Sequence, residues 1–216
     1  MDGSRIGIVI PAFNESKTIA AVVSNALMFG TPIVVDDGSS DATGETARSA
    51  GASVVQHSTN RGYDCALNSG FVRAAELDCE YIISIDADGQ HDAAIIGSFI
   101  QALDSGADVV IGIRDRFQRI AERLFAYTAV VLWEIQDPLC GMKGYTTQLY
   151  RELGYFDSYD SIGTELAIYA ARHGKRIAQI PVKTRPRLDA PRFGNTLRSN
   201  ARIMRSLVKG ILARDP

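Results

Sequence analysis

Apolar and polar positions in the first half of the chain predict short strands that alternate with helices. Ile6 to Pro11 form an unbroken apolar run, which is typical of a strand buried on both faces of a parallel sheet. In the next segment, Ile19, Val22, Val23 and Ala26 recur at helical spacing. The same alternation predicts strands over 6–11, 32–36, 52–57, 81–85 and 107–114, and helices over 15–30, 41–51, 65–77 and 93–106. Strands separated by helices of this length indicate a parallel sheet with right-handed crossovers.

Polar residues and glycines mark the expected helix ends. Asn14 is a candidate N-cap for the first helix, and Gly30 fits the position after its last turn. Asp41 and Asp92 precede the second and fourth helices and are expected to be caps.

The second half is less regular but still predicts one α/β domain over 1–195. A helix is expected over 116–135, a short strand over 141–145 and a further helix over 163–174. Residues 176–185 alternate like a strand near a sheet edge, where Pro181 can be accommodated.

The C-terminal segment 196–216 predicts a basic amphipathic helix. Its apolar residues recur at helical spacing, and five Arg or Lys side chains fall among and opposite them. Such a helix can lie on an anionic membrane, or it can pack on the domain or a second subunit with its basic face in water. Both interpretations stay open.

Composition limits the class of protein. The chain has 216 residues, 46% hydrophobic and 22% charged, which is globular rather than disordered. Cys65, Cys79 and Cys140 have no CxxC spacing, which favours a reducing compartment and no zinc knuckle. The longest apolar run, 124–133, is too short to span a bilayer, and no signal-type segment starts the chain. We therefore expect a cytoplasmic protein that can still touch the inner face of the membrane.

Charge is divided unevenly between the halves. Residues 1–110 hold 5 Lys and Arg against 15 Asp and Glu, whereas residues 111–216 hold 18 against 10. The division suggests metal capture in the first half and anion handling in the second, although exposed faces that merely differ in charge would give the same count.

Acidic residues gather where predicted strands end, which is where open parallel sheets bind ligands. Asp36 and Asp37 follow the second strand, and Asp86 and Asp88 follow the fourth. Each pair alone could be ordinary turn chemistry. The four carboxylates together would repel one another in one crevice, and a bound cation would relieve that repulsion.

Asp86, Asp88 and Gln90 offer only hard oxygen donors, which select Mg²⁺ or Mn²⁺ and leave positions for substrate phosphates. The sequence therefore predicts a metal that bridges a diphosphate. No GxGxxG or P-loop motif is present, so a nucleotide would be held by other means. Phe13 could contact its base, and Glu15, Asp36 or Asp37 could accept hydrogen bonds from base or ribose groups.

Five segments resemble family 2 glycosyltransferases in order and spacing. They are "IVIPAFNE", "IVVDDGSSDAT", "NRGYDCALNSG", "SIDADGQHD" and "VIGIR". Within that family, "DADGQHD", "DPLCGMKGY" and "TELAIYAARHGKRIAQIPV" resemble dolichyl- and polyprenyl-phosphate mannose synthases and their bacterial relatives. The resemblance runs from about Ile6 to Asn195. It implies a GT-A fold and transfer of a sugar, with inversion, from a GDP- or UDP-sugar to a polyprenyl phosphate.

The resemblance also implies roles for individual residues. Asp86, Asp88 and Gln90 would hold the metal, Asp88 and Arg114 would act in catalysis, and Arg114 would meet phosphate. The residues expected in the nucleotide site are Pro11, Phe13, Glu15, Asp36, Asp37 and Asp86. Phe13 stands where the family has Tyr, and Asn195-Thr196 replaces a Ser-Lys pair, which puts the acceptor contacts in question.

A phosphate acceptor is already ionised near neutral pH and needs arginines more than a protein base. Arg114, Arg187 and Arg192 are the candidates, with Arg116, Arg119 and Arg123 in reserve. A saccharide or other hydroxyl acceptor would need a base, for which Glu165 or Asp160 are the candidates. A nucleotidyltransferase and a catalytically silent homologue are the remaining alternatives. No feature indicates nucleic acid as a partner.

Overall fold

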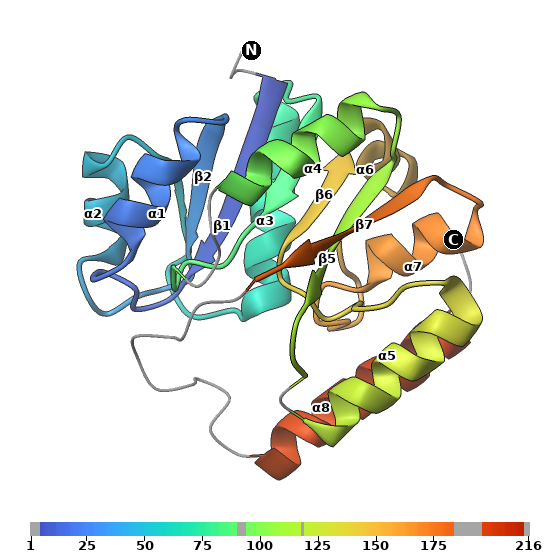
Figure 1. Cartoon of the computed structure of the whole chain (residues 1–216). Coiled ribbons are helices and arrows are strands. Elements are labelled where there is room, and N and C mark those ends of the chain that lie inside the picture. The colour runs from blue at the N-terminus through green and yellow to red at the C-terminus, as the bar shows by residue number, and fades with distance from the viewer. Residues whose placement is uncertain (1–4, 90–93, 118, 184–195, 214–216) are drawn as a thin grey trace.

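A single seven-stranded sheet organises the chain (Figure 1). The computed structural model describes residues 5–89, 94–117, 119–183 and 196–213. The strands lie in the order β3-β2-β1-β4-β6-β5-β7. They are β1 (Ile6–Ala12), β2 (Thr31–Asp36), β3 (Ser53–Gln56), β4 (Tyr81–Ser84), β5 (Val109–Arg114), β6 (Lys143–Thr146) and β7 (Ile177–Val182).

All neighbouring strands run parallel except at β6, which is antiparallel to both β4 and β5. Ile83 of β4 lies opposite Gly144, and Val110 of β5 lies opposite the same residue. Because β6 runs the other way, the segment that precedes it arrives at the edge where β4 and β5 end. The mostly parallel α/β sheet predicted from the pattern is confirmed, and β7 is an edge strand as expected.

Helices cover both faces of the sheet. One core packs α1 (Ile19–Ala26), α2 (Thr43–Ser49) and α4 (Ala94–Asp104) against one face, where Phe99 and Ile100 are buried. The opposite core includes Phe71 of α3 (Tyr63–Glu76) and Phe125 of α5 (Ile120–Trp133). The other helices on that side are α6 (Thr147–Leu153), α7 (Glu165–Arg172) and α8 (Thr196–Leu212).

The first helix begins later than its pattern predicts, and the expected Asn14 cap is wrong. α1 starts at Ile19, with Thr18 at the N-cap position. Asn14 instead has φ 53° and its side-chain oxygen accepts from the Ser40 backbone N–H at 2.8 Å. Gly30 is required by contact, since a Cβ there would lie 2.4 Å from the Ile6 carbonyl oxygen.

The C-terminal helix α8 packs against α5 (Figure 1). Ile203 and Leu207 are buried in the same core as Phe125, while Leu197 and Leu212 are exposed. The Arg172 guanidinium donates to the Gly210 and Ala213 carbonyls at 2.7 Å each. A side chain of α7 therefore provides hydrogen-bond donors for the backbone carbonyls at the C-terminal end of α8. One face of this helix therefore packs on the domain. Among the described residues, no helix combines the length and apolar character needed to cross a membrane.

Candidate active site

Three loops meet at the carboxyl edge of the sheet, where β1, β2 and β4 end. The Ser39 hydroxyl accepts from the Asn14 N–H at 2.9 Å, and the Thr43 hydroxyl accepts from the Glu15 N–H at 2.8 Å. Thr18 extends the connection, because its hydroxyl donates to the Ala87 carbonyl at 2.8 Å. The loops after β1, β2 and β4 therefore form one hydrogen-bonded edge, as the motif positions predict.

Pro11, Phe13 and Glu15 all lie on this edge. Pro11 and Phe13 are half-buried and Glu15 is buried. The Glu15 carboxylate accepts from the Thr18 hydroxyl at 3.3 Å. Thr18 thus ties a predicted nucleotide residue to the loop that carries Asp86 and Asp88.

Asp36 and Asp37 are both buried and organise backbone at the end of β2. The Asp36 carboxylate accepts from the Ser39 N–H at 3.0 Å. Asp37 accepts from the Arg61 and Gly62 N–H groups at 2.9 and 2.8 Å, and it lies 2.7 Å from His57 Nδ1. These contacts place backbone N–H groups against the carboxylates of both residues. In the part of the chain that the structure describes, no group of three or more acidic, His or Cys side chains could hold a metal.

Asp86 and Asp88 are half-buried in the segment after β4. Gly141 closes one side of Asp86 so tightly that a Cβ at that position would lie 2.5 Å from Oδ2. Two carboxylates at alternate positions, at the crevice edge of the sheet, are hard oxygen donors that fit Mg²⁺ or Mn²⁺. Gln90, the third expected ligand, lies outside the described residues.

Arg114, at the end of β5, forms a two-pronged ion pair with Asp137. Its Nε and one terminal nitrogen donate to the two carboxylate oxygens at 2.7 and 2.9 Å, and the Asp137 side chain is fully buried. A third contact places the other terminal nitrogen 3.7 Å from Glu122. Burial lowers the pKa of Arg114, but the hydrogen bond and charge of Asp137 outweigh it and raise that pKa overall. Arg114 is therefore a fixed cation at the carboxyl edge.

A cavity of about 160 Å³ lies beside Arg114, between the N-terminal ends of α5 and α8. Arg119 and Arg202 line it, together with Glu122 and Ser199. The apolar part of the wall comes from Leu139, Ile162 and Ile203. Arg119 pairs with Glu122 at 2.9 Å, so the cavity combines paired cations with apolar surface. Arg187 and Arg192, the other predicted phosphate ligands, lie outside the described residues.

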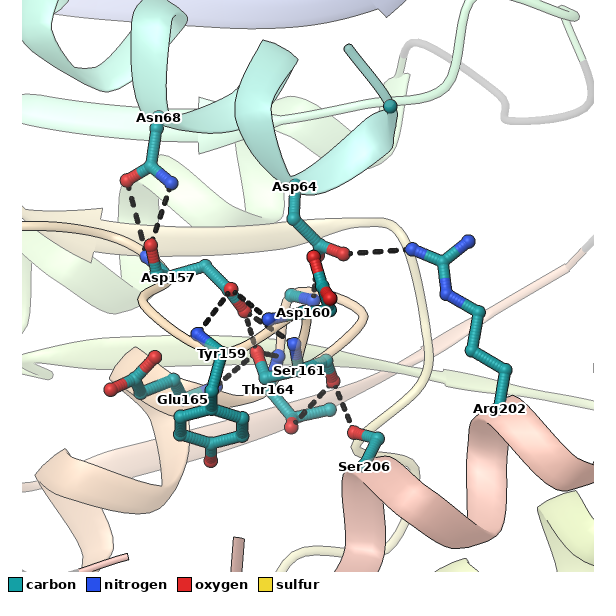
Figure 2. Close-up of polar contacts among 12 residues, drawn as sticks. Asp64, Asn68, Asp157, Tyr159, Asp160, Ser161, Thr164, Glu165, Arg202 and Ser206 are labelled. Carbon is teal, nitrogen blue, oxygen red and sulfur yellow. Dashed lines mark hydrogen bonds and ion pairs between the residues drawn. The ribbon is translucent and has the colours of Figure 1, made fainter. Parts of the chain in front are cut away.

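The loop before α7 is folded around Asp157, as Figure 2 shows. The Asp157 carboxylate accepts from the backbone N–H groups of Tyr159, Asp160 and Ser161 at 3.1, 2.8 and 2.7 Å. Glu165 accepts from the N–H and hydroxyl of Ser158 at 2.6 and 2.8 Å. Glu165, a candidate base for a hydroxyl acceptor, therefore stabilises this loop.

Asp64 links this loop to the C-terminal helix (Figure 2). Its carboxylate accepts from the Gly163 N–H at 2.8 Å and pairs with Arg202 at 3.0 Å. Ser206 adds a second link, donating to the Ser161 carbonyl at 2.6 Å. Burial, and then the charge of Asp157, raises the pKa of Asp64 to about 6, although Arg202 and the Gly163 N–H oppose the shift.

Reasoning from the sequence missed Asp64, Glu122 and Asp137 as members of the site. Asp137 stood inside the "DPLCGMKGY" motif, but the motif does not show that it holds Arg114. Lys143 was missed too. It is buried, its ammonium donates to the Gly163 carbonyl at 2.9 Å, and burial lowers its pKa.

Curated relatives include enzymes that act on lipid phosphates. A dolichyl-phosphate hexose transferase of Haloferax volcanii is 26% identical over 217 residues, covering 94% of this chain and 92% of the relative. An undecaprenyl-phosphate 4-deoxy-4-formamido-L-arabinose transferase of Edwardsiella ictaluri is 31% identical over 199 residues, covering 82% of this chain and 59% of the relative.

The fold also matches a solved structure, glucosyl-3-phosphoglycerate synthase from Mycobacterium tuberculosis in complex with Mn²⁺, uridine diphosphate and glucosyl-3-phosphoglycerate. The TM-score is 0.78 at 22% identity, with 97% of this chain and 79% of that chain covered. The GT-A-like fold expected from the resemblance is thereby confirmed. Residues 7–155, more than half of the chain, match the family model "Glycosyl transferase family 2". The chain therefore belongs to glycosyl transferase family 2 and is a glycosyltransferase.

Proposed function

We propose that this glycosyltransferase transfers a sugar, with inversion, from a GDP- or UDP-sugar to a polyprenyl phosphate in a reaction that depends on Mg²⁺ or Mn²⁺. The relatives named for dolichyl and undecaprenyl phosphate support the acceptor class. Solved structures of the same fold that contain Mn²⁺ or Mg²⁺ with uridine diphosphate support the donor class and the metal.

The donor would bind along the edge formed by the first three loops. Asp86 and Asp88, with Gln90, would hold the metal, which neutralises charge on the leaving diphosphate when bound. Pro11, Phe13, Glu15, Asp36 and Asp37 would line the nucleotide site. Because the Asp36 and Asp37 carboxylates already accept backbone N–H groups, we expect them mainly to fix the shape of that site.

One observation carries the acceptor assignment: the cavity is lined by three arginines, Arg114 among them, and by apolar residues. A guanidinium has five N–H donors; Arg114 uses two of them on the Asp137 carboxylate, and its other terminal nitrogen lies 3.7 Å from Glu122. Forked donors suit phosphate, while Leu139, Ile162 and Ile203 suit the first isoprene units. Arg187 and Arg192 remain candidates for the same anion.

The contacts of Glu122 and Glu165 favour an acceptor that brings its own nucleophile. A phosphate monoester oxygen is ionised near neutral pH and can attack the anomeric carbon, so that the C–O bond to the diphosphate breaks as the new one forms. Glu165 is held by Ser158, and Glu122 is paired with two arginines. Neither arrangement resembles that of a free general base.

A lipid acceptor also implies that the enzyme works at a membrane surface. We expect it at the cytoplasmic face, with the basic helix α8 against anionic headgroups.

A small phosphorylated hydroxyl acceptor is the second candidate, because the same arginines would fit it and a solved structure of the same fold contains glucosyl-3-phosphoglycerate. Radiolabelled UDP- and GDP-sugars with Mn²⁺ can be offered a short polyprenyl phosphate, phosphoglyceric acid or a simple saccharide. We expect label in the lipid phosphate. Label only in phosphoglycerate or the saccharide would reject the polyprenyl acceptor.

A further inference from the structure

Exposed apolar side chains are concentrated on α5 and α8. Of the thirteen large hydrophobic side chains that are exposed in the described part of the chain, ten belong to these two helices. On α5, Ile120, Leu124, Tyr127 and Val131 follow helical spacing along one stripe, and Ile120 and Tyr127 are 82% and 71% exposed. A stripe of this kind on a helix whose other face is fully packed indicates a partner.

The two helices lie side by side and run in the same direction (Figure 1). Their first turns share the cavity lined by Arg119 and Ser199. Near their other ends a Cβ at Gly210 would lie 3.7 Å from the ring of Trp133. Leu197, Val208 and Leu212 are exposed on α8 and recur at helical spacing.

The charges on these helices identify the partner's chemistry. α5 and α8 contain one acidic residue, Glu122, and it is buried against Arg114 and Arg119. Arg123, Arg198 and Arg205 are exposed among the apolar residues. Two copies of such a surface would repel each other, whereas an anionic bilayer would attract the arginines and accept the apolar side chains.

We infer that α5 and α8 together form a membrane-docking surface for anionic lipid, in which α5 supplies most of the apolar contact. This inference rests on the proposed function and extends it from the C-terminal helix to a second helix inside the catalytic domain. It places the cavity for the acceptor phosphate at the helix ends of the docked surface, so that the phosphate can enter while the prenyl chain stays in the bilayer.

Vesicle sedimentation tests the inference without any substrate. The probe is a vesicle of equal parts phosphatidylcholine and phosphatidylglycerol, with pure phosphatidylcholine for comparison. The α5 variant is Ile120→Gln/Tyr127→Gln/Val131→Gln, and its matched control is Leu27→Gln/Met28→Gln/Val72→Gln, which changes the other three exposed apolar side chains. We expect the α5 variant to bind anionic vesicles about tenfold more weakly than wild type, and the control to bind like wild type.

Equal binding of wild type and the α5 variant would overturn the inference. The inference would also be overturned if wild type does not bind anionic vesicles and sediments as a dimer while the α5 variant sediments as a monomer. The surface would then join two copies of the chain. If the triple variant fails to fold, the same vesicle measurement can be made with Tyr127→Gln alone and with Arg123→Gln/Arg205→Gln. The arginine variant should reduce binding and its dependence on salt.

Turnover with a short polyprenyl phosphate dispersed in detergent separates this inference from the proposed function. Turnover by the α5 variant at the wild-type rate, with unchanged vesicle binding, would reject the docking surface and keep the function. If the α5 variant binds vesicles more weakly but neither wild type nor the variant forms a lipid product, the docking surface would be supported and the polyprenyl phosphate acceptor rejected.

Discussion

Gly141 lies against the Asp86 carboxylate so closely that even a methyl group at position 141 would fall 2.5 Å from Oδ2 and 2.6 Å from Oδ1. The residue comes from the segment that precedes β6, and the carboxylate comes from the segment after β4. The Ser84 hydroxyl fastens the two, donating to the Gly141 carbonyl at 2.8 Å. The position of the first metal-ligand candidate is therefore set by a glycine 55 residues away in sequence.

Gly141→Ala should displace the Asp86 carboxylate and weaken binding of the metal ion. We expect the Mn²⁺ concentration for half-maximal turnover to rise at least about tenfold, equivalent to about 1.4 kcal/mol. Gly97→Ala in α4 is the control, because a Cβ there makes ordinary contact at 3.5 Å. Unchanged metal dependence in Gly141→Ala would show that Asp86 does not hold the ion.

Asp88→Asn should abolish metal-dependent turnover while leaving the fold intact. The amide keeps the shape of the side chain but loses the charge that a divalent ion requires. We expect a loss of about a hundredfold or more in kcat, and a Tm without metal close to that of wild type. Asp78→Asn, at a side chain that is 92% exposed, should change neither. Wild-type turnover that persists with a chelator would exclude the metal mechanism altogether.

Arg114→Gln should destabilise the protein as well as impair turnover. It leaves the fully buried Asp137 carboxylate without its forked partner, and breaking a buried pair in this way costs about 3–5 kcal/mol. Arg5→Gln removes a solvent-exposed pair with Glu80 and should change the free energy of unfolding far less. Urea unfolding of both variants measures the contrast, and similar losses would mean that Asp137 finds another donor.

Asp64 should make stability depend on pH between about 4 and 6. Its pKa rises from an ordinary 3.8 to about 6 in the folded protein, mainly through burial. The native carboxyl holds its proton more tightly than the unfolded one, so its contribution is complete below pH 3.8 and is lost as pH rises through 6.

Asp64→Asn removes this dependence. The unfolding free energy of wild type relative to Asp64→Asn should fall by roughly 1–3 kcal/mol between pH 4 and pH 7, as chemical denaturation at several pH values can measure. Asp78→Asn again serves as the control. Parallel stability curves for wild type and Asp64→Asn would contradict the shifted pKa.

The sequence predicts the strands well because buried parallel strands have unbroken apolar runs, as in Ile6 to Pro11. It also places Glu15, Asp36 and Asp86 at strand ends, since strand order along the chain determines which loops share an edge. It does not predict that the Asp37 carboxylate accepts hydrogen bonds from the Arg61 and Gly62 N–H groups, because these contacts come from a loop that begins 24 residues away.

Long-range pairs escape sequence reasoning for the same reason. Asp64 and Arg202 are 138 residues apart, and their contact exists only because α8 packs back onto the domain. The periodicity of α8 showed an apolar face but not what it would cover. The exposed stripe of α5 could not be predicted either. An apolar run such as "LFAYTAVVLW" indicates a buried helix, and only the structure shows which of its side chains are exposed.

The single antiparallel strand has a consequence for how this enzyme could diversify. β6 lies between β4, which leads to Asp86, and β5, which ends at Arg114. Two strand spacings of about 4.8 Å therefore separate the strand that leads to Asp86 from the strand that ends at Arg114. That span is set by backbone pairing rather than by loops, so substitutions in the surrounding loops can change which substrates bind without changing the spacing between the strands that lead to Asp86 and Arg114.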